Sequence, residues 1–260
     1  MVEHHRESIA RVTERLAADS EVLALILGGS VAHGFARPDS DIDVMLVVAD
    51  PDYEARQRDG RLLYYDTEVC TYEGGYVDGK YLTRSLLAAV AERGSEPARF
   101  AFADAEILFS RLDGLEATVR AAARYPAEEK ASRIQRFYAQ LEAWHWYAHE
   151  ALKCDDRHLL ATATSRLVLF GGRLILAHNE ILYPYHRWFL RVLSQAPSKP
   201  ADLMDRIARL HAEPTAENFF AFYQAVSEFR TWECDRVWPV QFMVDSELNW
   251  LDGHTPVDDL

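Results

Sequence analysis

Three aspartates fall within five residues at the start of an apolar run, which reads DSDIDVMLVV from Asp39. Alternate side chains of a strand point to the same face, so we expect Asp41 and Asp43 on one face and Ile42 and Val44 on the other. Two carboxylates held this close resist joint ionisation unless a cation lies beside them. Mg²⁺ prefers oxygen ligands and is often bound by a pair of carboxylates together with substrate phosphates. The pair therefore indicates a magnesium site.

The turn that precedes the aspartates offers groups that bind phosphate. A short apolar run, Leu23 to Leu27, is followed by Gly28, Gly29 and Ser30. Glycines let the backbone approach an anion closely, and the serine hydroxyl can donate a hydrogen bond at the start of a short helix. The turn and the aspartates together predict a metal-bound nucleoside triphosphate lying between them.

The complete string GGSVAHGFARPDSDIDV, residues 28–44, resembles the motif of the nucleotidyltransferase superfamily that includes DNA polymerase β. That motif is a Gly-Ser pair, ten intervening residues and an Asp-x-Asp at the head of an apolar strand. The string is especially similar to the bacterial branch that contains the aminoglycoside nucleotidyltransferases, which confer antibiotic resistance. The resemblance implies transfer of a nucleoside monophosphate from a triphosphate such as ATP to an acceptor hydroxyl, with release of pyrophosphate.

The resemblance also implies a third carboxylate from a later strand, which would complete two adjacent Mg²⁺ sites. We assign it to Asp78 in GGYVDGKYL, where Tyr76, Asp78 and Lys80 share a face, and Asp66, Glu68 and Glu73 remain alternatives because the register is not fixed by sequence. In this scheme the catalytic and metal-binding residues of the first half are Asp41, Asp43 and Asp78, and the groups that steady the β- and γ-phosphates are Gly28, Gly29 and Ser30.

The segment QLEAWHWYAHEALK places Glu142, His145, His149 and Lys153 along one helix face. Kanamycin-type relatives use a helical-domain glutamate as general base and a lysine one turn later as a phosphate contact. The resemblance thus implies His149 as the base and Lys153 on phosphate, with Glu142 and Glu150 as alternative bases. A solvated polar helix face is the more common reason for such a stripe.

Periodicity predicts an α+β protein in which a small mixed-sheet nucleotidyltransferase domain, residues 1–124, precedes an all-α helical bundle, residues 125–260, that binds the substrate. In the first domain we expect strands at 23–27, 42–48, 68–72, 76–82 and 106–109, with a hairpin turn at 73–75, and helices at 3–18, 51–61 and 84–92. For the second domain we expect helices at 115–124, at the boundary, and at 127–154, 158–177, 185–193, 201–210 and 216–234.

Composition limits the partners. Acidic residues outnumber basic ones by 41 to 28, so the surface repels nucleic acid and favours a small or cationic acceptor. The three cysteines have no paired spacing, which is typical of a reducing cytoplasm. The longest apolar stretch, residues 167–177, contains Arg173, so we expect no membrane span.

The predicted function is therefore metal-dependent nucleotidyl transfer to a small hydroxyl-bearing molecule, possible acceptors including aminoglycosides. Two alternatives use the same fold: a catalytically silent nucleotide-binding module with a regulatory role, and transfer of AMP to a protein. The complete GGS turn and the aspartates argue against a silent module, and toxin-neutralising AMP transferases are shorter chains. The sequence does not determine the oligomeric state, and a homodimer is compatible with it.

Overall fold

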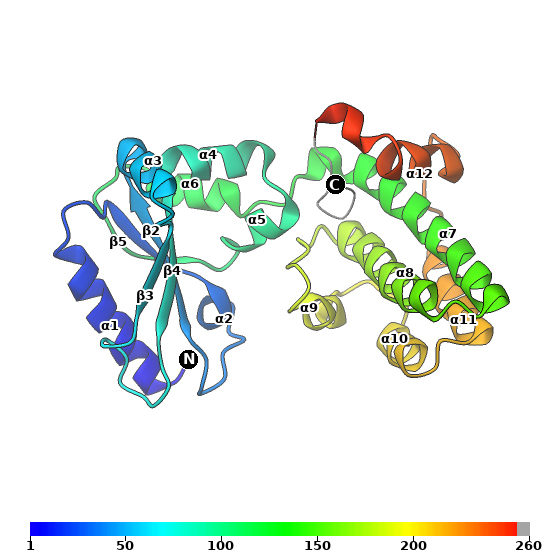
Figure 1. Cartoon of the computed structure of the whole chain (residues 1–260), viewed down its shortest axis with the longest axis horizontal. Coiled ribbons are helices and arrows are strands. Elements are labelled where there is room, and N and C mark those ends of the chain that lie inside the picture. Colours follow the sequence, from blue (N-terminus) through cyan, green and yellow to red (C-terminus); the bar gives the residue numbers. More distant parts are fainter. Residues whose placement is uncertain (254–260) are drawn as a thin grey trace. The chain divides into compact units, whose positions relative to one another are not determined.

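The computed structural model describes residues 1–253, which divide into two units, one spanning Met1–Tyr125 and the other beginning at Pro126 (Figure 1). The predicted second domain extends to residue 260, and residues 254–260 lie outside the described part. The elements of the first unit are α1 (Glu3–Ala17), β1 (Ala24–Leu27), α2 (Gly29–Ala32), β2 (Ile42–Val48), α3 (Asp50–Arg58), β3 (Leu63–Asp66), β4 (Val77–Thr83), α4 (Arg84–Arg93), α5 (Glu96–Phe100), β5 (Glu106–Ser110) and α6 (Leu115–Ala122).

The first unit is built on a five-stranded sheet in the order β3-β4-β2-β1-β5. β2 pairs with β4 in parallel, whereas the other neighbouring pairs are antiparallel, so the sheet is mixed. One face packs on α1 and the other on α4 and α6 (Figure 1). The mixed sheet followed by a helical second unit confirms the predicted α+β class.

Side-chain alternation along β2 decides which residues enter which core. Ile42, Val44 and Leu46 are buried in the cluster that includes the apolar side chains of α1. Met45 and Val47 point the other way, into the cluster formed with α4 and α6. Side chains two residues apart in a strand share a face. Asp43, two residues before Met45, therefore lies on the face of the sheet that α4 and α6 cover.

The predicted strand at 68–72 is wrong. A turn does form at 73–75, where Gly75 N–H donates to the Tyr72 carbonyl at 3.1 Å, but it does not join two strands as a hairpin. The strand that pairs with β4 is β3, Leu63–Asp66, and the connection between them covers residues 67–76. Side chains take up the backbone N–H groups of the predicted strand: Glu68 N–H donates to Asp66 and Thr71 N–H donates to the Ser8 hydroxyl. Val69 is buried, which explains the apolar alternation of that segment without a strand.

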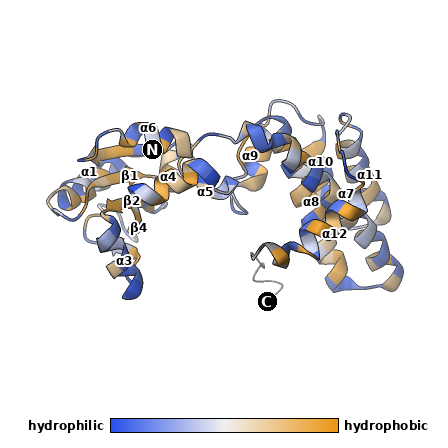
Figure 2. Ribbon diagram, turned by 90° about the horizontal axis from the view of Figure 1, so that it is seen from above, coloured by the Kyte–Doolittle hydropathy of each residue, from blue (hydrophilic) through white to orange (hydrophobic). Residues whose placement is uncertain are grey.

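The second unit consists of helices and, within its described residues, contains no strand. Its elements are the 3₁₀ turns η1 (Ala127–Glu129) and η2 (Asn249–Asp252) and the helices α7 (Lys130–Cys154), α8 (Arg157–His178), α9 (Phe189–Gln195), α10 (Leu203–Ala212), α11 (Ala216–Ser227) and α12 (Trp238–Ser246). α7 packs against α8, α11 and α12. Hydrophobic and hydrophilic residues alternate around α7 and α12, as expected for helices with one buried side (Figure 2).

Two helices of this unit begin or end at residues other than those predicted from the sequence. The helix expected at 185–193 begins only at Phe189, because Tyr185 has a positive φ of 71° that a helix cannot contain. The helix expected at 216–234 ends at Ser227, and the following chain folds back so that the Trp232 indole donates to the Val226 carbonyl. α12 was not predicted, although Pro239 in its first turn is a helix-start signal.

One helix in the described part of the chain, α8, has the length and hydropathy of a membrane-crossing segment. Half of that segment is buried within the structure, where α8 packs against α7, α10 and α11. Close packing is visible at Gly171, where an added Cβ would lie 2.7 Å from the Phe222 ring. A core helix of a bundle has the same composition, so this feature is weak evidence for a membrane span.

All six tryptophans of the chain, Trp144, Trp146, Trp188, Trp232, Trp238 and Trp250, belong to the second unit. Tryptophan fluorescence therefore reports on the helical unit, and the first unit has to be followed by another signal.

We predict that Asp66→Ala destabilises the first unit by about 1.5–3 kcal/mol, the usual range for hydrogen bonds to a charged group. The buried Asp66 carboxylate accepts from Arg15 at 2.7 Å, from the Tyr64 hydroxyl at 2.8 Å and from Glu68 N–H at 2.8 Å. Urea unfolding followed by far-UV circular dichroism and hydrogen exchange measures the loss. The control is Asp59→Ala, which breaks an exposed ion pair with Arg61, and an equal effect of both variants would contradict the prediction.

The contribution of the Asp66 carboxylate to the stability of the first unit depends on pH. Burial disfavours ionisation of Asp66, but hydrogen bonds from Tyr64 and Glu68 N–H, with the charge of Arg15, outweigh burial and lower its pKa. The stabilisation is therefore fully present above the unfolded pKa of about 4, and is lost as pH falls through the lower folded value.

Candidate active site

The GGS turn and the first residues of β2 are joined by backbone and side-chain hydrogen bonds. Gly28 N–H donates to the Asp43 carbonyl at 2.9 Å, which extends the pairing of β1 with β2 by one step. Ser30 N–H donates to the Asp43 carboxylate. The carboxylate of Asp43 is thus held against the turn that the sequence predicted as a phosphate-binding loop.

Gly29 is the residue that makes this contact sterically feasible. Its φ is +61°, and a Cβ added to it would lie 1.7 Å from Asp43 Oδ2, far inside van der Waals contact. No side chain fits at this position while Asp43 keeps its place. The glycine is therefore required both by its backbone angle and by the neighbouring carboxylate.

The Ser30 hydroxyl is buried and has no hydrogen-bond partner in the structure. A buried hydroxyl without a partner is destabilising, so such groups are usually satisfied by a ligand or a water. The hydroxyl lies one residue beyond Gly29 and beside Asp43, at the position where the sequence motif predicts phosphate. This orphaned donor is compatible with a phosphate oxygen.

Asp41, Asp43 and Asp78 interact electrostatically. Burial, followed by the negative charge of Asp41 and also that of Asp78, raises the pKa of Asp43, while Ser30 N–H and Lys80 act in the opposite direction. Asp43 and Asp78 are register partners on the parallel strands β2 and β4, so their side chains leave the same face of the sheet. The structure brings the three predicted metal ligands into one neighbourhood.

Asp41 lies just before β2, in a loop that α1 and the β3–β4 connection support. The Ser40 carbonyl accepts from the Tyr72 hydroxyl at 2.6 Å and from the His5 ring at 3.1 Å. The Asp41 carboxylate accepts from Tyr76, and its charge and this hydrogen bond raise the pKa of the Tyr76 phenol. These contacts fix the loop from which Asp41 reaches the site.

The register separates Asp78 from its competitors. Asp66 is paired with Val77 across β3 and β4, so it lies on the opposite face from Asp78, where it bonds to Arg15. Glu68 also contacts Arg15, and Glu73 lies exposed in the β3–β4 connection. Among the four candidates, only Asp78 shares a face with Asp43.

Two neighbours of the carboxylates were not assigned a role from the sequence. Lys80, two residues beyond Asp78, favours the ionised form of Asp43. Tyr65 is the register partner of Asp78, and its exposed ring lies 5.4 Å from the ring of Tyr76. Tyr65 was missed because β3 was placed too late in the sequence, although the run LLYY at 62–65 has the composition of a strand.

The predicted residues of the helical stripe lie together on α7 but have other partners. Glu142 accepts from the Tyr223 hydroxyl at 2.8 Å and also from Tyr138. His149 contacts His145 through their Nε2 atoms at 3.3 Å. Lys153 forms an exposed ion pair with Glu150 at 3.5 Å. The catalytic roles of Glu142 and His149 and the phosphate contact of Lys153 stay predictions.

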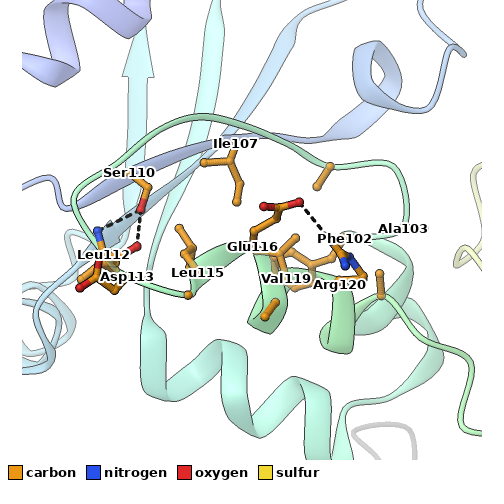
Figure 3. Close-up of a pocket in the computed structure, with 14 residues that line it drawn as sticks. Phe102, Ala103, Ile107, Ser110, Leu112, Asp113, Leu115, Glu116, Val119 and Arg120 are labelled. Atoms are coloured by element: carbon orange, nitrogen blue, oxygen red, sulfur yellow. Dashed lines mark hydrogen bonds and ion pairs between the residues drawn. The ribbon is translucent and has the colours of Figure 1, made fainter.

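A cavity of about 950 Å³ lies between β5 and α6 in the first unit (Figure 3). Ile107, Leu115 and Val119 line it, and the Glu116–Arg120 ion pair of 2.7 Å stands beside them (Figure 3). None of the three aspartates lines this cavity. Cavity size alone therefore does not identify the candidate active site.

Comparison with known proteins agrees with the motif. Residues 9–87 match the family model described as "Nucleotidyltransferase domain", and this segment contains the GGS turn and all three aspartates. Among solved structures, the chain is similar to a nucleotidyltransferase-like protein from Exiguobacterium sibiricum 255-15, with 10% identity and a TM-score of 0.48 over 98% of this chain and 83% of that one. No curated protein matches the sequence significantly.

The first unit thus carries a nucleotidyltransferase domain, and the enzyme class of the protein is nucleotidyltransferase. Membership of the kanamycin-type branch stays a prediction.

We predict that Gly29→Ala lowers nucleotidyl transfer by about 100-fold or more, because the new Cβ displaces Asp43, and misplacement of a catalytic group by about 1 Å has effects of this size. The control is Gly34→Ala, which has a similar φ of +68° but no atom within 4 Å of the added Cβ. It introduces the same backbone strain without the collision. Pyrophosphate release measures transfer, and equal losses in both variants would show that strain alone matters.

We predict that Asp43→Asn stabilises the first unit in the absence of divalent cations at pH 7. The pKa of Asp43 is raised in the fold, so its charge disfavours folding as pH rises above the unfolded pKa, and this penalty is complete above the folded value. Asparagine removes the charge and keeps an oxygen for Ser30 N–H. Thermal unfolding followed by circular dichroism should give a higher midpoint for the variant, and a lower midpoint contradicts the electrostatic account.

Proposed function

We propose that the first unit catalyses Mg²⁺-dependent transfer of a nucleoside monophosphate from a nucleoside triphosphate to a hydroxyl of a small molecule. One observation carries this proposal: the partly buried carboxylate of Asp43 lies against Gly29 and Ser30, beside Asp41 and Asp78, and next to an unpartnered serine hydroxyl. Carboxylate oxygens that could bind a metal ion therefore lie near a hydroxyl that could donate a hydrogen bond to phosphate, which supports phosphoryl-type transfer.

The donor set fits a hard divalent cation. Burial, and then the like charges of Asp41 and Asp78, raise the pKa of Asp43, and a bound cation would stabilise the ionised carboxylate against these effects. Within residues 1–253, no three His, Cys, Asp or Glu side chains form a ready-made ligand group. Mg²⁺ is commonly bound by one or two carboxylates and completed by water and phosphate oxygens, so the site we propose needs the nucleotide for completion.

The proposed reaction forms one bond and breaks one bond at the α-phosphorus. The acceptor oxygen attacks this phosphorus, the bond to the bridging oxygen of the β-phosphate breaks, and the electron pair leaves with pyrophosphate. The proton of the acceptor hydroxyl passes to a carboxylate, which we assign to Asp78 because it is the exposed member of the trio. When bound, Mg²⁺ supplies charge neutralisation on the triphosphate and lowers the pKa of the attacking hydroxyl.

The residues of the turn have a binding role in this scheme. Gly28 and Gly29 let the backbone approach the β- and γ-phosphates, and Ser30 donates its buried hydroxyl to a phosphate oxygen. Asp41 and Asp43 hold the cation on the triphosphate. The net charge of −13 supports a neutral or cationic acceptor, and aminoglycosides are the first class to be tested.

We predict that Asp78→Asn lowers pyrophosphate release by at least about 100-fold while the first unit stays folded, because a proton acceptor typically contributes about 10²–10⁴-fold. The assay combines Mg²⁺, each of the four nucleoside triphosphates and a panel of aminoglycosides and other polyols. Asp113→Asn, an exposed loop aspartate of the same unit, is the matched control.

Full activity of Asp78→Asn would remove Asp78 from the mechanism. Nucleotide binding without pyrophosphate release from any acceptor in the panel would contradict the proposed transfer and favour a silent nucleotide-binding module.

A further inference from the structure

Two histidines one turn apart on α7 face each other through their ring nitrogens. Nε2 of His145 and Nε2 of His149 are 3.3 Å apart, whereas the ring centroids are 4.7 Å apart. The nitrogens therefore face each other at hydrogen-bond distance beside the helix. Two imidazoles at positions i and i+4 of a helix are a spacing that binds metal ions in other proteins.

The orientation of His145 is fixed by a second helix. Its ring stacks on that of Tyr223 from α11, with centroids 3.9 Å apart and planes within 4° of parallel. The Tyr223 hydroxyl in turn donates to Glu142, one turn before His145 on α7. His149 is exposed, so the nitrogen pair is reachable from solvent. One ligand is thus held rigidly and the other is free to adjust.

The distance between the two Nε2 atoms matches the distance between two imidazole nitrogens that bind the same metal ion. Zn²⁺ binds imidazole nitrogen at about 2.0–2.1 Å in tetrahedral geometry, which places two such ligands about 3.4 Å apart. The observed 3.3 Å needs almost no rearrangement. Chelation also requires both rings to be unprotonated, so binding weakens at low pH.

Most other histidines use ring nitrogens in contacts within the protein. The rings bonded in this way, with their partners, are His4 to Pro38, His5 to Ser40, His33 to Asp104, His178 to Ser198 and Arg230, and His186 to Tyr183. The adjacent pair His4 and His5 differs from the α7 pair, because each Nε2 already bonds a backbone carbonyl.

We propose that His145 and His149 form a chelating site for a divalent transition metal ion such as Zn²⁺, Ni²⁺ or Cu²⁺. In the part of the chain described here no third His, Cys, Asp or Glu joins them, so water or a small ligand takes the remaining positions. Imidazole nitrogen favours these ions over Mg²⁺, which prefers oxygen. The site is therefore chemically distinct from the carboxylate site of the proposed function and does not depend on it.

The experiment titrates the full chain with Zn²⁺ by calorimetry, in excess Mg²⁺ and without nucleotide. Cu²⁺ serves as a second probe, because it quenches nearby indoles and Trp144 and Trp146 flank His145. We expect one Zn²⁺ per chain, and at least a tenfold loss of affinity in His145→Ala and in His149→Ala. His158→Ala, an exposed histidine of α8, should bind Zn²⁺ like the wild type.

Zn²⁺ affinity that is unchanged in the folded double variant His145→Ala/His149→Ala overturns the proposal, and so does the absence of Zn²⁺ binding to the wild type. Because His145 packs on Tyr223, circular dichroism must first establish that its variant is folded. The exposed His149 provides the second variant if His145→Ala does not fold. Loss of nucleotidyl transfer in any of these proteins has no bearing on the result.

Discussion

The contact between the Asp43 carboxylate and the turn at Gly29 and Ser30 is the constraint on which the candidate active site depends. It joins the end of β1 to the start of β2, so the turn and the strand that carry the proposed phosphate and metal contacts are hydrogen-bonded to each other. The parallel pairing of β2 with β4 then fixes Asp78 beside Asp43. The rest of the first unit, α1 on one face and α4 and α6 on the other, holds these three strands in place.

This constraint has an electrostatic side. Folding brings Asp41 and Asp78 toward the partly buried Asp43, and like charges in such a setting oppose one another. These neighbouring like charges lower the stability of the fold, so stability alone does not explain why the three aspartates lie together. Ser30 adds a buried hydroxyl that the protein itself leaves unsatisfied. Both features become favourable when a cation and a phosphate are present, which is why they support a nucleotide site more strongly than the size of any cavity does.

Local spacing made the central part of the site predictable. The GGS turn, Asp41 and Asp43 lie within 17 residues, and strand alternation alone places the two aspartates on one face. The position of β3 was not predictable in this way, because residues 68–72 have the alternation of a strand although side chains satisfy their backbone. Because of that error, Tyr65 was not predicted to lie near the site. The identity of the third carboxylate also stayed open among Asp78, Asp66, Glu68 and Glu73. Only the strand register, a property of distant segments, separates them.

The unequal distribution of indole rings has a practical consequence. Since every tryptophan belongs to the helical unit, the protein carries a built-in optical label for one half and none for the other. Emission and backbone dichroism recorded on a single sample can therefore tell whether the halves melt together or in sequence. Such a comparison would reveal how strongly the halves are coupled in solution without cutting the chain.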